Sequence, residues 1–279
     1  MTRNATTDRH APTVPPVVHS PLLGRFPFVV HAVTGRVPGL GRADGNLGYS
    51  GGRDRPDAWA MRQLWCAELG LDPRAIVTSG QVHGADVVRV RAADAGRGAT
   101  PETQIGVADA MVTDAVGPVL LSLHADCLPI IFVDPGEPGR GPAVGVAHAG
   151  WRGTVAGVAA ATVAAMAREF GTRPDMLHVH LGPCIGACCY EVGDDVVAGW
   201  RERAGDGHEV AMRPTGGRPR FDLRGANRLL LERAGVRPER IETSAVCTRC
   251  DPDRWFSHRA QGAATGRFGA IVALRAANA

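Results

Sequence analysis

Three short blocks of this sequence contain the residue types that bind metal ions in proteins. They are Gln81-Val82-His83-Gly84, His124-Ala125-Asp126-Cys127 and His148-Ala149-Gly150-Trp151-Arg152-Gly153. Each block places an imidazole or a thiol next to small residues, which let the backbone turn sharply and approach a ligand closely. Three His and Cys ligands with a fourth position open to water or substrate are typical of a catalytic zinc site, and copper is a less specific fit. We therefore predict a catalytic metal site formed by His83, Cys127 and His148.

Spacing alone does not bring these three residues together, because long stretches of chain separate them. The prediction rests on their context, since all three stand at predicted strand ends, where side chains from separate strands converge. The alternative is three unrelated residues, one of them a buried cysteine.

The turn from Gly150 to Gly153 is a second candidate site, for an anion. It is expected to open a helix after a strand, so its free N–H groups favour phosphate, and Arg152 adds a fork of donors. Trp151 stands where a nucleotide-triphosphate loop has lysine, and no Gly-x-Gly-x-x-Gly opens a helix after a strand, which excludes both nucleotide motifs. The alternative is a tight turn with a packed Trp151 and a solvated Arg152.

Other cysteines and histidines offer weaker metal signals. Cys184-x-x-x-Cys188-Cys189 and Cys247-x-x-Cys250 could together form a four-thiolate structural zinc site. The first spacing is loose, and Asp251-Pro252 directly follows the second, which disfavours a redox motif, so we expect ordinary core thiols. His178 and His180 share a strand face as a copper pair would, but such histidines are more often structural.

Charged residues near the blocks complete the candidates. Asp126 could orient a ligand or shuttle a proton, and Asp109 and Asp114 lie close to the blocks, although capping and turn roles are commoner. Four arginines of the last third could line a phosphate pocket or face water: Arg224, Arg254, Arg259 and Arg267.

The composition disfavours a nucleic-acid or membrane protein. The 31 basic and 28 acidic side chains give a net charge of +3 without long single-sign runs, so we expect no nucleic-acid or membrane surface. No stretch approaches the roughly twenty apolar residues that span a bilayer, and no secretory signal is visible, so a cytoplasmic location is expected. The seven cysteines are an odd number and are expected to be reduced.

Hydrophobic periodicity predicts the elements that must position the blocks. Strands are predicted near residues 28–30, 75–77, 86–90, 119–123, 128–133, 143–147, 178–181 and 268–274, and helices over 56–69, 154–170, 194–204 and 222–234. The glycine-rich residues 36–52 are expected to form a long loop that contacts substrate. Because strands and helices mix without strict alternation, we predict the α/β (α+β) class, as a single layered domain of mixed β-sheets flanked by helices over residues 21–279. Residues 1–20 are expected to form a flexible leader.

Several ordered blocks carry a family resemblance. They are residues 81–84, 108–113, 125–129, 148–153, 181–186, 188–193, 256–259 and 265–267. Together they strongly resemble the laccase-domain proteins, which are also described as multi-copper polyphenol oxidoreductases and as purine nucleoside phosphorylases. The resemblance runs from about Phe28 to the C-terminus.

The resemblance implies a zinc-binding cytoplasmic enzyme that cleaves adenosine, inosine and methylthioadenosine with phosphate and also deaminates adenosine. It implies that His83, Cys127 and His148 are both catalytic and metal-binding, in a layered α/β domain similar to bacterial toxin hydrolases with a Cys–His pair. Its partners are then a purine nucleoside and phosphate, and we expect a monomer or a weak homo-oligomer. The expected substrate-binding residues are Arg36, Asn46 and Arg62 from the resemblance, with Trp151 and Arg152 from the anion-binding turn.

The sequence departs from the family at His124, where the family usually has Thr or Ser, and in its first glycine-rich loop. Both could reshape the pocket, and His124 could compete as a ligand. Three alternatives stay open: a metal- or Cys127-dependent amidohydrolase acting on a peptidoglycan precursor, a copper-dependent polyphenol oxidase, and a metal-stabilised binding module. The oxidase is the weaker enzyme alternative, because the chain has only one His-x-His pair.

Overall fold

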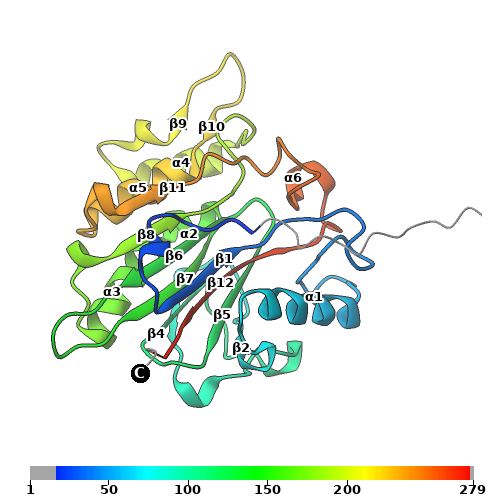
Figure 1. The fold of residues 1–279 in the computed structure, drawn as a ribbon. Helices are drawn as coiled ribbons and strands as arrows, with labels where there is room; N and C mark the ends of the chain where they lie inside the picture. The colour runs from blue at the N-terminus through cyan, green and yellow to red at the C-terminus, as the bar shows by residue number, and fades with distance from the viewer. Residues whose placement is uncertain (1–16, 277–279) are drawn as a thin grey trace, which may run out of the picture.

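Residues 17–276, which the computed structural model describes, form two stacked β-sheets with helices on both outer sides (Figure 1). The smaller sheet has the order β1 (Val29–Val33), β12 (Phe268–Leu274), β5 (Val119–His124) and β2 (Ile76–Val77). The larger has the order β11 (Ile241–Thr243), β8 (His178–Leu181), β6 (Leu128–Asp134), β7 (Ala143–Ala149), β4 (Ala110–Thr113) and β3 (Val87–Arg89). Both sheets mix parallel and antiparallel pairs. A short hairpin joins β9 (Met212–Arg213) to β10 (Arg220–Phe221).

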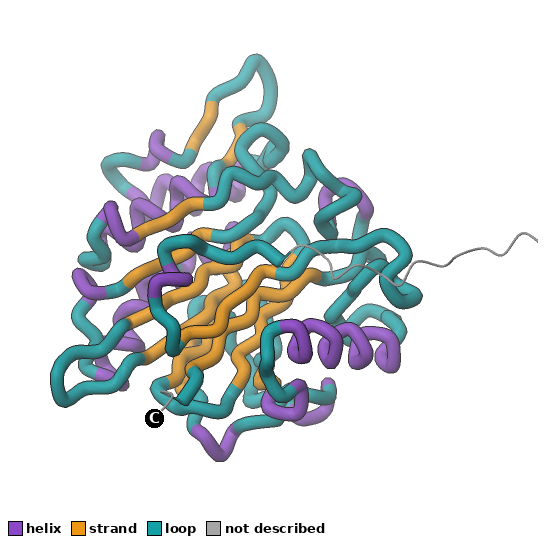
Figure 2. The backbone as a smooth tube through the Cα atoms, viewed as in Figure 1, coloured by secondary structure: helices purple, strands orange, loops and turns teal. Residues whose placement is uncertain are grey.

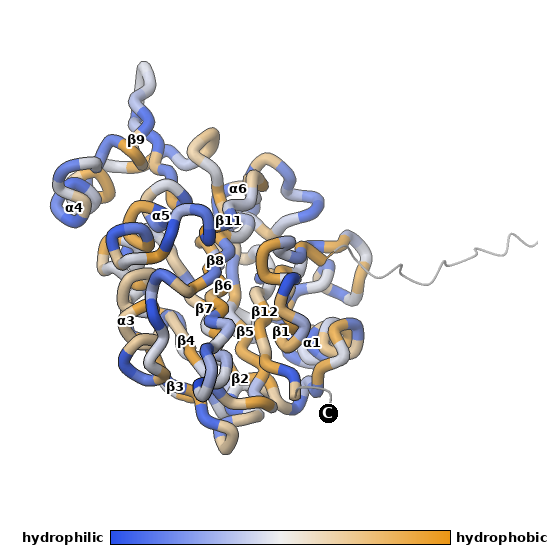
Figure 3. The backbone as a smooth tube through the Cα atoms, turned by 60° about the vertical axis from the view of Figure 1, so that its left-hand side comes forward, coloured by the Kyte–Doolittle hydropathy of each residue, from blue (hydrophilic) through white to orange (hydrophobic). Residues whose placement is uncertain are grey.

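Helices cover the outer face of each sheet. Helix α1 (Arg55–Glu68) packs on the smaller sheet. Four helices lie on the side of the larger sheet: α2 (Trp151–Ala156), α3 (Val158–Phe170), α4 (Asp194–Ala204) and α5 (Leu223–Arg233). Figure 3 shows the layers from the side, with α3, the larger sheet, the smaller sheet and α1 in succession. The short α6 (His258–Gln261) lies apart from these layers.

Alternation of side chains along the strands builds this packing. On β7, Ala147 faces the core under the helices, whereas Val144 and Val146 face the core between the sheets. On β12, Val272 points between the sheets and Ile271 points toward α1. Both faces of these strands are buried, which explains why they read as continuous apolar runs. The structure confirms the predicted mixed α/β architecture.

Two predicted elements differ in a way that matters for the site. The apolar runs on either side of residues 124–127 belong to different sheets, so this block is a crossover between the layers. The predicted helix over 154–170 begins earlier, at Trp151, and is two helices, because Gly157 adopts a φ of 90° that ends α2. The short α2 can therefore point its first turn at the crossover.

The predicted leader falls partly outside the described residues, which begin at residue 17. Within its last residues, Val18 pairs with Val33, and the Ser20 hydroxyl donates to Glu242 at 2.5 Å. Figure 2 shows how much of the fold is loop, as the glycine and proline content suggests. Over residues 17–276, no helix has the length and apolar character needed to cross a membrane.

Candidate metal and substrate site

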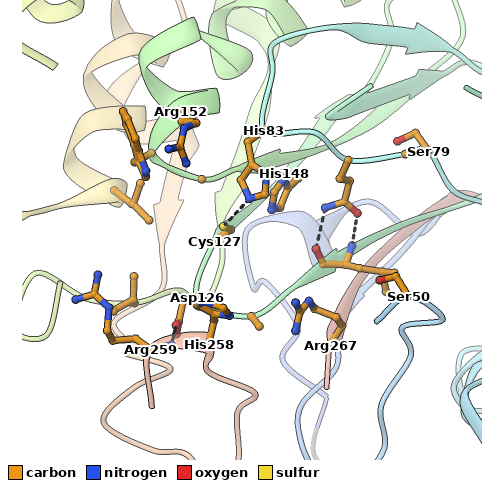
Figure 4. Close-up of a pocket in the computed structure, with 18 of the residues that line it drawn as sticks. Ser50, Ser79, His83, Asp126, Cys127, His148, Arg152, His258, Arg259 and Arg267 are labelled. Atoms are coloured by element: carbon orange, nitrogen blue, oxygen red, sulfur yellow. Dashed lines mark hydrogen bonds between the residues drawn. The ribbon is translucent and has the colours of Figure 1, made fainter. Parts of the chain in front are cut away.

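The three predicted metal ligands meet at a cavity of about 680 Å³ (Figure 4). The ligand atoms of His83, Cys127 and His148 all lie within 4.8 Å of one another, and Cys127 Sγ is 3.9 Å from His83 Nε2. His83 is exposed, Cys127 is partly exposed and His148 is buried. A ring of soft and borderline donors that opens into a cavity is the arrangement of a catalytic metal site rather than a closed structural one.

Strand pairing places Cys127 and His148 side by side. Strands β6 and β7 are antiparallel, with Pro129 opposite His148, so Cys127 directly before β6 comes next to the end of β7. Gly150 completes this corner, because a Cβ there would lie 2.9 Å from His83 Cδ2 and 3.0 Å from Cys127 Sγ. Only glycine lets the backbone pass this close to the ligands.

Asp109, directly before β4, fixes the other ligands. Its carboxylate accepts backbone hydrogen bonds from Val82, His83 and Gly84 at 3.1, 2.9 and 2.7 Å. It also accepts a hydrogen bond from His148 Nδ1 at 2.8 Å, which leaves His148 Nε2 free to bind a metal. His83 itself has a φ of 65°, a left-handed conformation that non-glycine residues rarely adopt and that these backbone bonds hold in place.

Charges within the site favour a thiolate at Cys127 even without a metal. Burial opposes its ionisation, but the positive charge of His148 and hydrogen bonds from His148 and His83 lower the pKa of Cys127 to about 6. Burial likewise disfavours charge on His148, but the Cys127 thiolate and Asp109 raise its pKa to about 9. Thiolate is the form of cysteine that binds metals and acts as a nucleophile.

His124 is not a competing ligand. Its Nδ1 donates to the Cys127 carbonyl at 3.2 Å, and its Nε2 accepts from the Ser122 hydroxyl at 2.7 Å, so both ring nitrogens are occupied. Burial and the charge of His148 hold the pKa of His124 well below its usual range. His124, at which the sequence departs from the family, therefore holds the crossover in place through hydrogen bonds and does not change the ligand set.

Asp126 ties the crossover to the C-terminal part of the chain. The residue adopts a φ of 81°, and its carboxylate accepts from the Thr248 hydroxyl and from the Arg259 backbone N–H, both at 2.6 Å. Ile185 N donates to the Asp126 carbonyl at 2.9 Å. These bonds assign Asp126 a positioning role beside Cys127.

The cavity wall offers cations and aromatic faces. Arg152, Arg259 and Arg267 line it, together with Trp151 and Tyr190. The Arg152 guanidinium carbon is 4.4 Å from the centre of the Trp151 ring, and that of Arg259 is 5.1 Å from the centre of the Tyr190 ring. Anionic groups and planar rings are the ligands that such a wall suits.

The structure does not bring Arg36, Asn46 or Arg62 to the cavity lining. Arg36 pairs with Asp44 at 2.7 Å, and Arg62 is buried and donates to the carbonyls of Leu47 and Gly98. The Asn46 side chain accepts from Arg267 N at 2.8 Å, so it supports a lining residue from behind. Within the glycine-rich loop, Arg36 and Asn46 therefore hold the loop in place, whereas Ser50 of the same loop lines the cavity.

Several other predicted candidates also lie outside the cavity or outside a metal-binding group. Arg224 donates to the carbonyls of Ser244 and Val246, and Arg254 pairs with Asp251, so neither reaches the cavity. Asp114 directly follows β4, does not line the cavity and pairs with Arg89. Within residues 17–276, no group of potential metal ligands includes His178 or His180.

Some lining residues were missed as individual candidates, although several lie in the blocks that carry the resemblance. Gln81 holds its loop to β5 through two bonds with the Leu123 backbone, at 2.8 and 2.9 Å. His258 opens α6 at the cavity, and Ser50 and Ser79 line the side of the cavity away from Arg152 and Arg259 (Figure 4). Periodicity gives no signal for such residues, because they lie in loops, or at the start of a very short helix, whose path depends on distant partners.

Two stacked sheets between helical layers, with a His-Cys-His group at a cavity, define a layered α/β protein with a candidate metal centre. The chain belongs to the family described as multi-copper polyphenol oxidoreductase laccase, whose family model matches residues 30–275. This match confirms the resemblance drawn from the sequence blocks.

Relatives extend over most of the chain. The purine nucleoside phosphorylase YlmD of Geobacillus stearothermophilus is 38% identical over 232 residues, covering 82% of this chain and 83% of its own. A purine nucleoside phosphorylase of Deinococcus radiodurans is 37% identical over 263 residues, 93% of each chain. An adenosine deaminase from an unknown prokaryotic organism is 36% identical over 239 residues, 81% of this chain and 88% of its own. The crystal structure of YlmD from Geobacillus stearothermophilus superimposes with a TM-score of 0.85 at 36% identity, covering 92% of this chain and 94% of that one.

Proposed function

We propose that this protein is a zinc-dependent purine nucleoside phosphorylase. It would cleave adenosine, inosine and methylthioadenosine with phosphate, and it would also deaminate adenosine. The observation that carries the proposal is the His83-Cys127-His148 group at a cavity with arginine and aromatic walls, in a chain whose relatives are phosphorylases and a deaminase. Copper is the other metal that this ligand set could hold.

The residues fit a zinc ion. Two imidazoles and a thiolate are ligands that zinc prefers, and Asp109 orients His148 as outer carboxylates do in zinc sites. Gly150 leaves room at the ligands that a side chain would fill. When bound, such an ion would polarise a substrate group or lower the pKa of a bound water enough to make it a nucleophile.

The cavity suits a nucleoside in size and chemistry. Its volume of about 680 Å³ lies within the usual range for small-molecule sites, roughly 300–1,000 Å³. The rings of Trp151 and Tyr190 offer faces for a planar base, and Arg152, Arg259 and Arg267 offer charge for an anion. Arg36, which the resemblance implied as a substrate-binding residue, does not line the cavity, so Arg152 is the stronger candidate for phosphate.

Phosphorolysis would use these groups as follows. A phosphate oxygen forms a bond to the anomeric carbon of the ribose while the bond from that carbon to the purine nitrogen breaks. The electron pair of the broken bond leaves with the purine, which then takes up a proton. The arginines hold the attacking anion, and donors near the base favour departure of the purine by protonation or polarisation.

The test is product analysis after incubation of the pure protein with adenosine, with and without phosphate. We expect adenine and a ribose phosphate only when phosphate is present, inosine from deamination, and loss of both activities in Cys127→Ala. The matched control is Cys66→Ala, which removes a buried thiol of α1 that does not line the cavity. Adenosine that survives intact with wild-type protein would contradict the proposal.

A second candidate function follows from the lowered pKa of Cys127. A thiolate close to two imidazoles can attack an amide carbonyl, so the site could serve a cysteine-dependent amidohydrolase acting on a peptidoglycan precursor. This candidate predicts amide cleavage by metal-free protein and inactivation by thiol alkylation. Amide cleavage without nucleoside cleavage would favour it.

A further inference from the structure

Four cysteines gather outside the cavity, on two loops that follow neighbouring strands. Cys188 and Cys189 lie in the loop after β8, and Cys247 and Cys250 lie in the loop after β11. Their Sγ atoms are all within 4.8 Å of one another, and all four thiols are free. None of them lines the cavity, so this four-cysteine cluster is separate from the His-Cys-His group.

The spacing of the sulfurs matches metal coordination better than a disulfide. Cys250 Sγ lies 3.4 Å from Cys189 Sγ and 3.6 Å from Cys188 Sγ. Tetrahedral zinc with zinc–sulfur bonds of about 2.3 Å holds its sulfurs about 3.8 Å apart, whereas a disulfide bond is about 2.05 Å long. A zinc ion between the four thiols therefore needs only small adjustments of the side chains.

The surroundings are built for thiolates. The backbone N–H of Gly186 donates to Cys247 Sγ at 3.1 Å, and a hydrogen bond of this kind stabilises negative sulfur. A Cβ at Gly186 would lie 3.1 Å from Cys188 Sγ and 3.2 Å from Cys247 Cβ. The backbone at residue 186 therefore lies so close to the cluster that any side chain there would be crowded.

Cys184 is not part of the cluster, although the sequence pattern groups it with Cys188 and Cys189. Its thiol is buried in the core and donates to the Ile185 carbonyl at 3.4 Å. Burial raises the pKa of Cys184 to about 12, as expected for an ordinary core thiol. The four ligands are therefore the adjacent pair and the Cys-x-x-Cys pair.

The two loops reach the cavity through direct bonds. Thr248, between Cys247 and Cys250, donates its N–H to the Cys184 carbonyl at 3.1 Å and its hydroxyl to Asp126 at 2.6 Å. Asp126 precedes Cys127, and Tyr190, directly after Cys189, lines the cavity. A metal ion that joined the two loops would thus hold in place one wall of the cavity and the crossover that carries Cys127.

We propose that Cys188, Cys189, Cys247 and Cys250 form a structural zinc site that locks these two loops together at the cavity wall. The site is closed to substrate because protein supplies all four ligands, so it contributes stability rather than chemistry. The proposal does not depend on the reaction at Cys127.

The test separates the two metal sites by mutation. Protein is purified with reductant and without oxygen from cells supplied with zinc, and the zinc content per chain is measured by mass spectrometry. Cys127→Ala empties the cavity site and is expected to keep about one zinc. Adding Cys189→Ser and Cys250→Ser to Cys127→Ala is expected to remove it, whereas adding Cys66→Ala instead is expected to leave it.

Cobalt gives a second measurement that does not depend on activity. In the Cys127→Ala protein, Co²⁺ is expected to produce the intense thiolate charge-transfer and visible bands of a tetrahedral sulfur site, and a single Cys250→Ser change is expected to weaken or shift them. A chelator strong enough to remove the metal is expected to lower the melting temperature. Absence of both zinc and cobalt bands from folded Cys127→Ala would overturn the proposal, as would a disulfide among the four cysteines in the oxygen-free protein. Failure of nucleoside cleavage would leave these results unchanged, so the two proposals fail separately.

Discussion

At the scale of single residues, Asp109 decides how the candidate metal ligands are presented. One carboxylate accepts from three backbone N–H groups of the His83 turn and from His148 Nδ1. All of its partners are donors, so a residue that is only an acceptor suits the position. Removing the carboxylate would loosen two ligands together.

Asp109→Asn tests this arrangement with little change in shape. Whichever way the amide turns, its NH₂ group faces a donor, either His148 Nδ1 or the backbone of Val82 and Gly84. We expect zinc affinity and kcat/KM to fall about 10- to 100-fold, the usual cost of losing an outer carboxylate. Asp114→Asn, an exposed pair with Arg89, is the control. Equal zinc affinity of Asp109→Asn and wild-type protein in a chelator competition would contradict the role.

Arg152 is the residue that we expect to bind phosphate. It lines the cavity in the first turn of α2, where free N–H groups also favour an anion. Arg152→Gln is expected to raise the KM for phosphate about ten-fold or more with a smaller change for the nucleoside, because one charge-assisted hydrogen bond contributes about 1.5–3 kcal/mol. The matched control is Arg36→Gln, whose guanidinium pairs with Asp44 outside the cavity. A comparable rise in Arg36→Gln would count against the assignment.

At the scale of elements, the turn from β7 into α2 sets the space at the metal ligands. Gly150 has an ordinary φ of −74°, so alanine would not strain the backbone there. Its Cβ would nevertheless meet His83 and Cys127 at 2.9 and 3.0 Å. The glycine is required for close approach rather than for its conformation.

Gly150→Ala is therefore expected to displace the ligands while the helix still forms. We expect zinc content and kcat/KM to fall at least ten-fold, and crowding to cost about 1–3 kcal/mol of unfolding free energy. Gly141→Ala is the control, because a Cβ there meets no atom within 4 Å. Zinc titration and urea unfolding of both variants give the comparison. Unchanged zinc binding in Gly150→Ala would contradict the prediction, because it would show that the turn from β7 into α2 shifts enough to accommodate the added methyl group.

The elements also show what sequence reasoning could reach. Apolar runs predicted β5, β6 and β7 well, because strands buried on both faces have a strong signal. They did not reveal that β5 and β6 lie in different sheets, since strand pairing depends on partners distant in sequence. The His-Cys-His group was predicted because histidine and cysteine are metal-binding residue types and all three residues stand at predicted strand ends, where separate strands bring side chains together. Arg36, Asn46 and Arg62, which the resemblance implied as substrate-binding residues, lie outside the cavity lining. Nothing local in the sequence distinguishes a side chain that binds substrate from one that satisfies a loop's own carbonyls.

At the scale of the whole molecule, three distant segments meet at a buried histidine. His31 lies on β1 of the smaller sheet, and its Nε2 accepts from the backbone N–H of Ser20 at 2.9 Å. The Ser20 hydroxyl in turn donates to Glu242 on β11, at the edge of the larger sheet. The charged and titratable groups that face His31 are His19, His180 and Glu242. This corner joins the first described residues to both sheets.

Burial, with repulsion from His19 and His180, lowers the pKa of His31 to about 4. The unfolded chain, with an ordinary histidine pKa of about 6.5, binds a proton below that pH that the native state does not bind. Stability is therefore fully present above about pH 6.5 and falls as the pH drops toward 4, by about 2 kcal/mol between pH 7.5 and 5 for this group. His31→Gln, which keeps an acceptor for Ser20, is expected to lose that part of the pH dependence in urea unfolding. Other acid-sensitive groups, including the metal ligands, are the same in both proteins, so the difference between the two pH profiles of unfolding free energy reports on His31 alone. Parallel profiles would show that native His31 binds a proton as readily as the unfolded chain does, and would contradict the prediction.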